Sequence, residues 1–147
     1  MKYFAYGSNL NENQLQHRCP NSQYLGKAHL DGYRLTFDLY SSNWGGGVAD
    51  VVEDKNSKVW GLLYELTDED LKSLDGYEGH PNFYKRRAVN VIDMKGKNVE
   101  AITYEVVNKK SFIPPADEYL DLIKKAAEKY NFPEDYKQFL DSINFAF

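Results

Sequence analysis

The stretch YFAYGSNL, residues 3–10, places an apolar run directly before a glycine, a serine and an asparagine. Residues 2–6 read as a short buried strand, and residues 11–18 (NENQLQHR) read as a short helix capped by Asn9 or Asn11. A strand that ends in a small polar turn before a helix presents free backbone N–H groups, which suit an anion. The alternative is an ordinary capped turn without a ligand.

The composition is typical of one globular domain. The chain has 147 residues, 42% of them hydrophobic and 27% charged, so we expect residues 1–147 to form a single domain. A net charge of −4 argues against nucleic acid as a partner, and no stretch approaches the roughly 20 apolar residues of a membrane span. Cys19 is the only cysteine, which excludes an internal disulfide. Together with the lack of a signal-peptide pattern, this predicts a cytoplasmic protein.

Alternating polar and apolar residues, helix-capping residues and glycines predict the other strands and helices. Strands are expected at 31–40, 48–53, 58–65, 86–93 and 98–107, the last two joined as a hairpin by MKGK. Helices are expected from Thr67, with Asp70 at the capping-box position, to Gly76 or Gly79, over 116–130, and after Pro133. The glycines of SSNWGGG (41–47) indicate a loop or a close backbone approach. Because strands and helices do not alternate regularly, we expect an α+β fold with a curled or barrel-like mixed sheet and helices at its side.

Few residues offer obvious chemistry. The histidines, at 17, 29 and 80, are far apart and match no metal-binding motif, so we expect no metal and no cofactor. The chain has neither a nucleophile elbow nor a phosphate-binding loop. Nothing near Cys19 marks it as a nucleophile.

Two acidic residues break a local rule. Asp75 and Glu78 lie near the expected end of the central helix, where the helix dipole disfavours carboxylates. Phe83 and Tyr84 follow closely, and an apolar surround would raise the pKa of Glu78 and suit it to acid–base catalysis. The alternative is a solvated turn that contains two acids. An arginine of the basic run 85–87 can form an ion pair with either acid. An ion pair would lower the pKa of Glu78, so we expect Glu78 to face away from this run.

Two motifs together, YFAYGSNL and SLDGYEG…FYKR, resemble the gamma-glutamylcyclotransferase-like family, which includes AIG2-like proteins and gamma-glutamylamine cyclotransferases. NWGGGVADVV, KVWGLLYELTDEDLKSLD and the tail from Pro114 extend the resemblance over almost the whole chain. It implies a small mixed β-barrel with flanking helices, no cofactor, and conversion of a gamma-glutamyl amide into 5-oxoproline and a free amine.

The resemblance also implies residue roles. Glu78 of Tyr-Glu-Gly is the expected general base and acid. The substrate-binding residues it implies are Tyr3, Tyr6, Gly7, Ser8, Asn9, Leu10, Tyr84 and Tyr104. The expected partner is a small-molecule gamma-glutamyl substrate, and both a monomer and a homodimer remain open. Gamma-glutamyl amino acids and gamma-glutamyl amines compete as substrate classes, and a non-catalytic binding module on the same fold is the alternative function.

Overall fold

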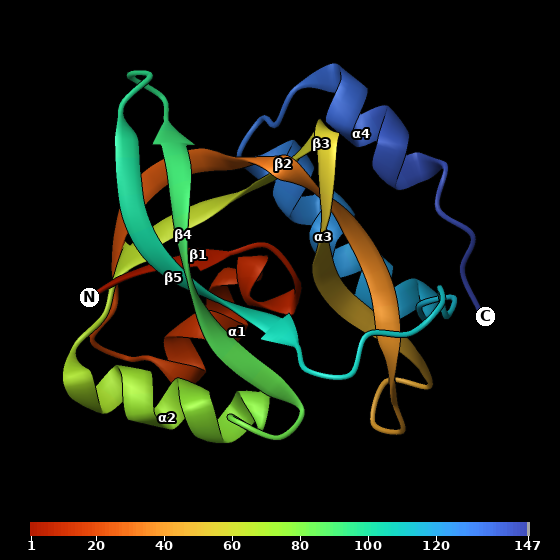
Figure 1. Cartoon of the computed structure of the whole chain (residues 1–147), viewed down its shortest axis with the longest axis horizontal. Coiled ribbons are helices and arrows are strands. Elements are labelled where there is room, and N and C mark those ends of the chain that lie inside the picture. The colour runs from red at the N-terminus through yellow and green to blue at the C-terminus, as the bar shows by residue number, and fades with distance from the viewer. Residues whose placement is uncertain (147) are drawn as a thin grey trace.

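The computed structural model describes residues 1–146, which form a five-stranded barrel with four flanking α-helices (Figure 1). The strands are β1 (Lys2–Ala5), β2 (Gln23–Ser41), β3 (Gly46–Glu65), β4 (Tyr84–Asp93) and β5 (Asn98–Val106). The helices are α1 (Glu12–Arg18), α2 (Asp68–Glu78), α3 (Asp117–Lys129) and α4 (Glu134–Asp141), and a 3-10 turn, η1 (Ser8–Leu10), follows β1. Within residues 1–146, no helix is both long and apolar enough to cross a membrane.

Closure of the barrel depends on the short strand β1. The strand order is β1-β3-β2-β4-β5, and β1 pairs antiparallel with β3 and parallel with β5. The parallel pairing joins Tyr3 to Ile102, and the other neighbouring strands are antiparallel. The predicted α+β fold with a mixed barrel and flanking helices is therefore confirmed, as is the hairpin between β4 and β5.

One predicted break in the sheet was wrong. The strands expected at 48–53 and 58–65 form a single strand, β3. Residues 54–57 bulge out of it opposite Gly32, and the Asp54 carboxylate accepts a backbone N–H (3.2 Å) and a hydroxyl (2.9 Å) within the bulge. Polar residues that bond to their own backbone occur in bulges as well as in turns, so the sequence of this segment does not distinguish the two.

The strand expected at 31–40 begins earlier than predicted, at Gln23. A register shift beside Gly26 interrupts the pairing of this early part with β3, so its side chains do not alternate cleanly between polar and apolar. The helices expected over 116–130 and after Pro133 are confirmed as α3 and α4, which lie beside each other in Figure 1.

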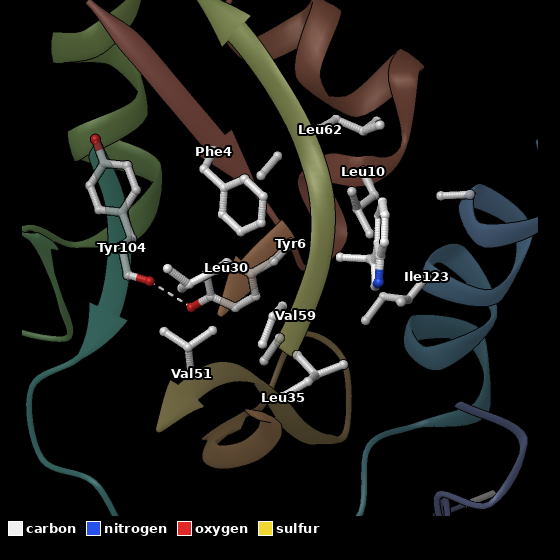
Figure 2. Close-up of a cluster of buried hydrophobic side chains, with 14 of the residues drawn as sticks. Phe4, Tyr6, Leu10, Leu30, Leu35, Val51, Val59, Leu62, Tyr104 and Ile123 are labelled. Carbon is white, nitrogen blue, oxygen red and sulfur yellow. Dashed lines mark hydrogen bonds between the residues drawn. The ribbon is translucent and has the colours of Figure 1, made fainter. Parts of the chain in front are cut away.

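The hydrophobic core fills the barrel and extends outward to α3. Residues 59–64 of β3 are buried without alternation, which requires cover on both faces of the strand. Figure 2 shows Phe4 on one side of the β3 ribbon, and Leu10 and Ile123 of α3 on the other. All three side chains are almost fully buried.

Local capping fixes the two helices that flank the barrel end. Asn11, not Asn9, caps α1, because its side-chain oxygen accepts a first-turn N–H at 2.9 Å. The Thr67 hydroxyl accepts the Asp70 N–H at 3.1 Å, and α2 ends at Gly79, which has a φ of 65°. The Asp70 carboxylate accepts the N–H of residue 21 (3.1 Å), so the second half of the expected capping box is used to attach α2 to the segment after α1.

The predicted close backbone approach occurs at Gly46 and Gly47. The chain beyond β5 crosses them: the Gly47 N–H donates to the Pro114 carbonyl at 3.0 Å, and the Ile113 N–H donates to the Phe37 carbonyl at 2.7 Å. A Cβ on Gly47 would lie 2.1 Å from the Ile113 carbonyl oxygen. This contact fixes the β2–β3 hairpin directly beside its turn.

Gly47→Ala is therefore expected to lower the free energy of unfolding by about 1–3 kcal/mol, because the crossing backbone must shift and weaken its hydrogen bonds. Urea denaturation measures the change. Gly76→Ala is the matched control, since a Cβ at this position in α2 meets nothing within 4 Å and helix propensity favours alanine by up to about 1 kcal/mol. Equal stability of the two variants would contradict the prediction.

Candidate active site

A cavity of about 510 Å³ lies at one end of the barrel. The strand directions bring the ends of β1, β2 and β5 and the starts of β3 and β4 to this end. Four segments form most of the cavity wall: residues 6–9, the 39–44 tip of the β2–β3 hairpin, residues 76–79 at the end of α2, and residues 83–84. The turn within the YFAYGSNL stretch thus faces the end of α2, the helix that carries Glu78.

The residues assigned by resemblance converge on this cavity with one exception. Its lining includes Tyr3, Tyr6, Gly7, Ser8, Asn9, Glu78, Tyr84 and Tyr104. Leu10 does not line it: the side chain is 1% exposed and packs into the core beside α3, and its N–H donates to the Gly7 carbonyl at 3.0 Å. Leu10 therefore stabilises the turn from behind and has no surface for a substrate.

The buried side chain of Asn9 connects the elements around the cavity. Its Nδ2 donates to the Tyr3 hydroxyl at 2.9 Å and to Oε1 of Glu78 at 3.3 Å. Its Oδ1 accepts from Nε2 of Gln14 at 3.0 Å and from the Arg18 guanidinium at 3.1 Å. Because both groups at Oδ1 can only donate, the amide orientation is fixed and its N–H₂ group must face Glu78.

Glu78 is the last residue of α2 and its carboxyl is only partly exposed. Burial raises its pKa from the ordinary 4.5 to about 7, although the Arg18 guanidinium and the Asn9 amide each oppose this shift. The carboxyl therefore exchanges a proton near neutral pH, which suits a group that must act as base and then as acid. The expectation that Glu78 has an environment of raised pKa is confirmed.

Asp75, the second acid in the motif, has the opposite environment. Its carboxylate accepts from Nε of Arg86 at 2.9 Å, forms an ion pair with the same guanidinium, and accepts from the Tyr104 hydroxyl at 2.6 Å. Burial alone would raise the pKa of Asp75, but these bonds hold it below its usual value. The basic run therefore pairs with Asp75, and Glu78 faces away from it, as expected.

The tyrosine hydroxyls of the wall mostly bond to the protein itself. Tyr6 donates to the Tyr104 carbonyl at 2.5 Å, the dashed line of Figure 2, and Tyr84 donates to the Ala49 carbonyl at 2.6 Å. Tyr3 differs, because its hydroxyl accepts from Asn9 and donates to no residue that the structure describes. Burial raises the pKa of Tyr3 well above its usual value, so it remains a neutral donor.

Other reactive groups lie outside the cavity. Burial raises the pKa of the Cys19 thiol to about 12, so it is no nucleophile near neutral pH. Asp38 also has a pKa raised to about 7, by burial and by the neighbouring Asp50, but it is 1% exposed and does not line the cavity. Within residues 1–146, no three His, Cys, Asp or Glu side chains are grouped so that they could hold a metal ion.

Several lining residues were not predicted as site residues from the sequence, among them Arg18, Trp44 and Tyr119. Tyr119 lies on the buried face of α3, and its hydroxyl accepts the Ala49 N–H at 2.9 Å. The only available signal was that a buried tyrosine needs a polar partner, which does not say where that partner lies. Arg18 ends α1, where a basic residue is also explained by the helix dipole.

A mixed barrel that places one carboxyl with a pKa raised to about 7 opposite a strand-to-turn segment defines a small-molecule site of enzyme type. The family model described as gamma-glutamyl cyclotransferase, AIG2-like, matches residues 3–126. Gamma-glutamylcyclotransferases of Bos taurus and Homo sapiens are 32% and 31% identical over 146 residues, which is 96% of this chain and 77% of each relative. A solved structure titled gamma-glutamyl cyclotransferase has a TM-score of 0.93 at 28% identity, covering 99% of this chain and 89% of that one. The chain belongs to the gamma-glutamyl cyclotransferase, AIG2-like family.

The raised pKa of Glu78 predicts a pH-dependent gain in stability for Glu78→Gln. The folded state holds the Glu78 proton more tightly than the unfolded chain, so the wild type loses stability as pH rises from about 4.5 through about 7. Glutamine can accept the same Asn9 bond and has no charge to desolvate. The variant should match the wild type near pH 4 and exceed it near pH 8 by on the order of 1–3 kcal/mol.

Urea denaturation at both pH values measures this difference. Glu69→Gln, the same change at an exposed position of the first turn of α2, is the control and should show no gain near pH 8. A Glu78→Gln variant without a gain near pH 8 would show that the carboxyl is not desolvated.

Proposed function

We propose that the chain closes the gamma-glutamyl group of its substrate into 5-oxoproline and releases an amino acid or amine, with Glu78 moving the protons. The chain is an enzyme of the gamma-glutamylcyclotransferase type. The observation that carries the residue assignment is that Glu78 is the only acid among the described residues of the cavity wall, which also contains no cysteine or histidine. The serines of this wall, at positions 8, 41 and 42, have no histidine beside them in the described lining to activate them, which favours a reaction in which the substrate supplies its own nucleophile.

The substrate's α-amine is that nucleophile. In the proposed reaction the Glu78 carboxylate takes a proton from the α-ammonium group, and the free amine attacks the γ-carbonyl carbon. Glu78 then protonates the leaving nitrogen, and the bond between that nitrogen and the γ-carbon breaks. Two protons leave the attacking nitrogen over the whole reaction and two reach the leaving nitrogen, so Glu78 ends as a carboxylate. Holding the amine against its own carbonyl can contribute roughly 7–11 kcal/mol to lowering the barrier.

The proposed binding of the glutamyl end uses the strand-to-turn segment. The first N–H groups of the Ser8–Leu10 turn have no partner inside the turn. A Cβ on Gly7 would lie 3.1 Å from the Ala49 Cβ and 3.3 Å from the Tyr119 hydroxyl, so glycine lets the turn pack closely against its neighbours. The N–H groups suit the α-carboxylate, while the Tyr3 hydroxyl keeps a proton that it can donate to substrate. The 5-oxoproline product, a cytoplasmic location and a homodimer remain expectations from the sequence.

Glu78→Gln should abolish turnover, because glutamine can neither take nor give the proton. The purified protein is incubated with gamma-glutamylalanine, and 5-oxoproline is measured by mass spectrometry. We expect a loss of at least about 10²-fold for Glu78→Gln and full activity for the control Glu69→Gln. Retained activity in Glu78→Gln would exclude Glu78 as the acid–base residue. Substrate binding without any product in the wild type would favour the non-catalytic binding module.

The pH profile gives an independent check. Because catalysis begins with the carboxylate form, kcat/KM should rise through a pKa of about 7 and fall where the free substrate loses its ammonium proton. Initial rates at low substrate concentration between about pH 5 and about pH 9 measure the profile. A profile that is flat through pH 7 would mean that Glu78 does not titrate in the free enzyme.

A further inference from the structure

Arg18 differs from the other arginines of the chain in having no acidic partner. Three of the four arginines form ion pairs with carboxylates: Arg34 with Asp54, Arg86 with Asp75, and Arg87 with Glu53 and Glu105. Within residues 1–146, no carboxylate oxygen lies within 4.0 Å of the Arg18 guanidinium. Glu78 lies near enough for Arg18 to oppose its raised pKa but outside ion-pair distance, so the half-buried guanidinium is left with room for a direct anionic partner.

The guanidinium of Arg18 is held against the cavity wall. It donates to Oδ1 of Asn9 at 3.1 Å, and its central carbon lies 4.7 Å from the centre of the Tyr77 ring. This hydrogen bond leaves most of its five N–H groups without a partner among the described residues. Arg18 is also the only lysine or arginine in the described lining of the cavity, so it is the place where that wall offers a full positive charge.

The charges of the two competing substrate classes differ by one carboxylate. Both classes carry an α-carboxylate and an α-ammonium group on the glutamyl end, which the proposed function places at the 7–9 segment and at Glu78. A gamma-glutamyl amino acid carries a second carboxylate, next to the leaving nitrogen. A gamma-glutamyl amine lacks it.

The position of Arg18 suits this second carboxylate. Tyr77 directly precedes Glu78 in α2 and is 52% exposed, so the Arg18–Tyr77 pair lies toward the open side of the cavity. The proposed function holds the glutamyl end at the turn, which leaves the open side of the cavity for the leaving group. A guanidinium whose plane is fixed by a ring and a hydrogen bond presents a fork that matches a carboxylate.

We propose that Arg18 binds the carboxylate of the leaving amino acid and so selects gamma-glutamyl amino acids over gamma-glutamyl amines. This inference rests on the proposed function. It also has an electrostatic consequence. Arg18 opposes the raised pKa of Glu78, and a carboxylate that neutralises Arg18 weakens this opposition while the substrate is bound.

The test uses two substrates that differ only in this carboxylate, gamma-glutamylalanine and gamma-glutamylethylamine. The readout is the ratio of their kcat/KM values, in which any general effect of Arg18 on Asn9 or Glu78 cancels. Arg18→Gln should lower the ratio about 10- to 100-fold, the loss expected for one charge-assisted contact. Arg18→Lys should lower it less, since it keeps the charge and loses the fork. Arg34→Gln, at an arginine outside the cavity, is the matched control and should leave the ratio unchanged.

Each outcome separates the inference from the proposed function. An unchanged ratio in Arg18→Gln, with both rates lowered equally, would overturn the inference and place Arg18 at the glutamyl end or in support of Asn9. Equal kcat/KM values for the two substrates in the wild type would overturn it without any variant, which covers the case in which Arg18→Gln does not fold. If the wild type forms 5-oxoproline from neither substrate, the proposed function itself fails.

Discussion

The hydrogen bonds of the Asn9 side chain are the constraint on which the candidate site depends. A buried amide must satisfy its donors and its acceptor, and here its four partners come from three different parts of the fold. Gln14 and Arg18 come from α1, Tyr3 from the strand that closes the barrel, and Glu78 from the end of α2. The amide therefore fixes, in one arrangement, how far the Glu78 carboxyl lies from the turn that it faces.

A raised pKa alone does not identify the acid–base residue. Asp38 and Glu78 both have pKa values raised to about 7, mainly by burial, but only Glu78 opens onto the cavity. Asp75 is close to Glu78 in sequence, and an arginine and a tyrosine keep it ionised. The three carboxyls thus differ in two independent properties, titration near neutral pH and access to a ligand, and Glu78 alone combines them.

The sequence predicted what is encoded locally. The helix caps, the β4–β5 hairpin and the glycine approach at 46–47 each follow from a few adjacent residues, and the family motifs located most of the cavity wall. It did not predict what depends on pairing over distance. The bulge that unites β3 has the composition of a turn, and Leu10 belongs to a motif of binding residues although its side chain packs outward against α3. That Arg18 has no carboxylate within ion-pair distance can be recognised only from the positions of the nearby carboxylates in the folded chain.

The interior and the mouth of the cavity differ in how firmly their side chains are bonded to the barrel, and this decides which substitutions each part tolerates. In the interior, Tyr6 and Tyr84 direct their hydroxyls to backbone carbonyls, so their rings form a wall that is part of the barrel. At the mouth, Tyr77 and Phe83 are 52% and 63% exposed, and their contacts restrain the barrel little. Substitutions in the interior must therefore disturb the fold, whereas the mouth can change with small effects on stability. In the proposed function the glutamyl end is held by the rigid part, and the leaving group lies toward the mouth, where Arg18 connects the two through its bond to Asn9.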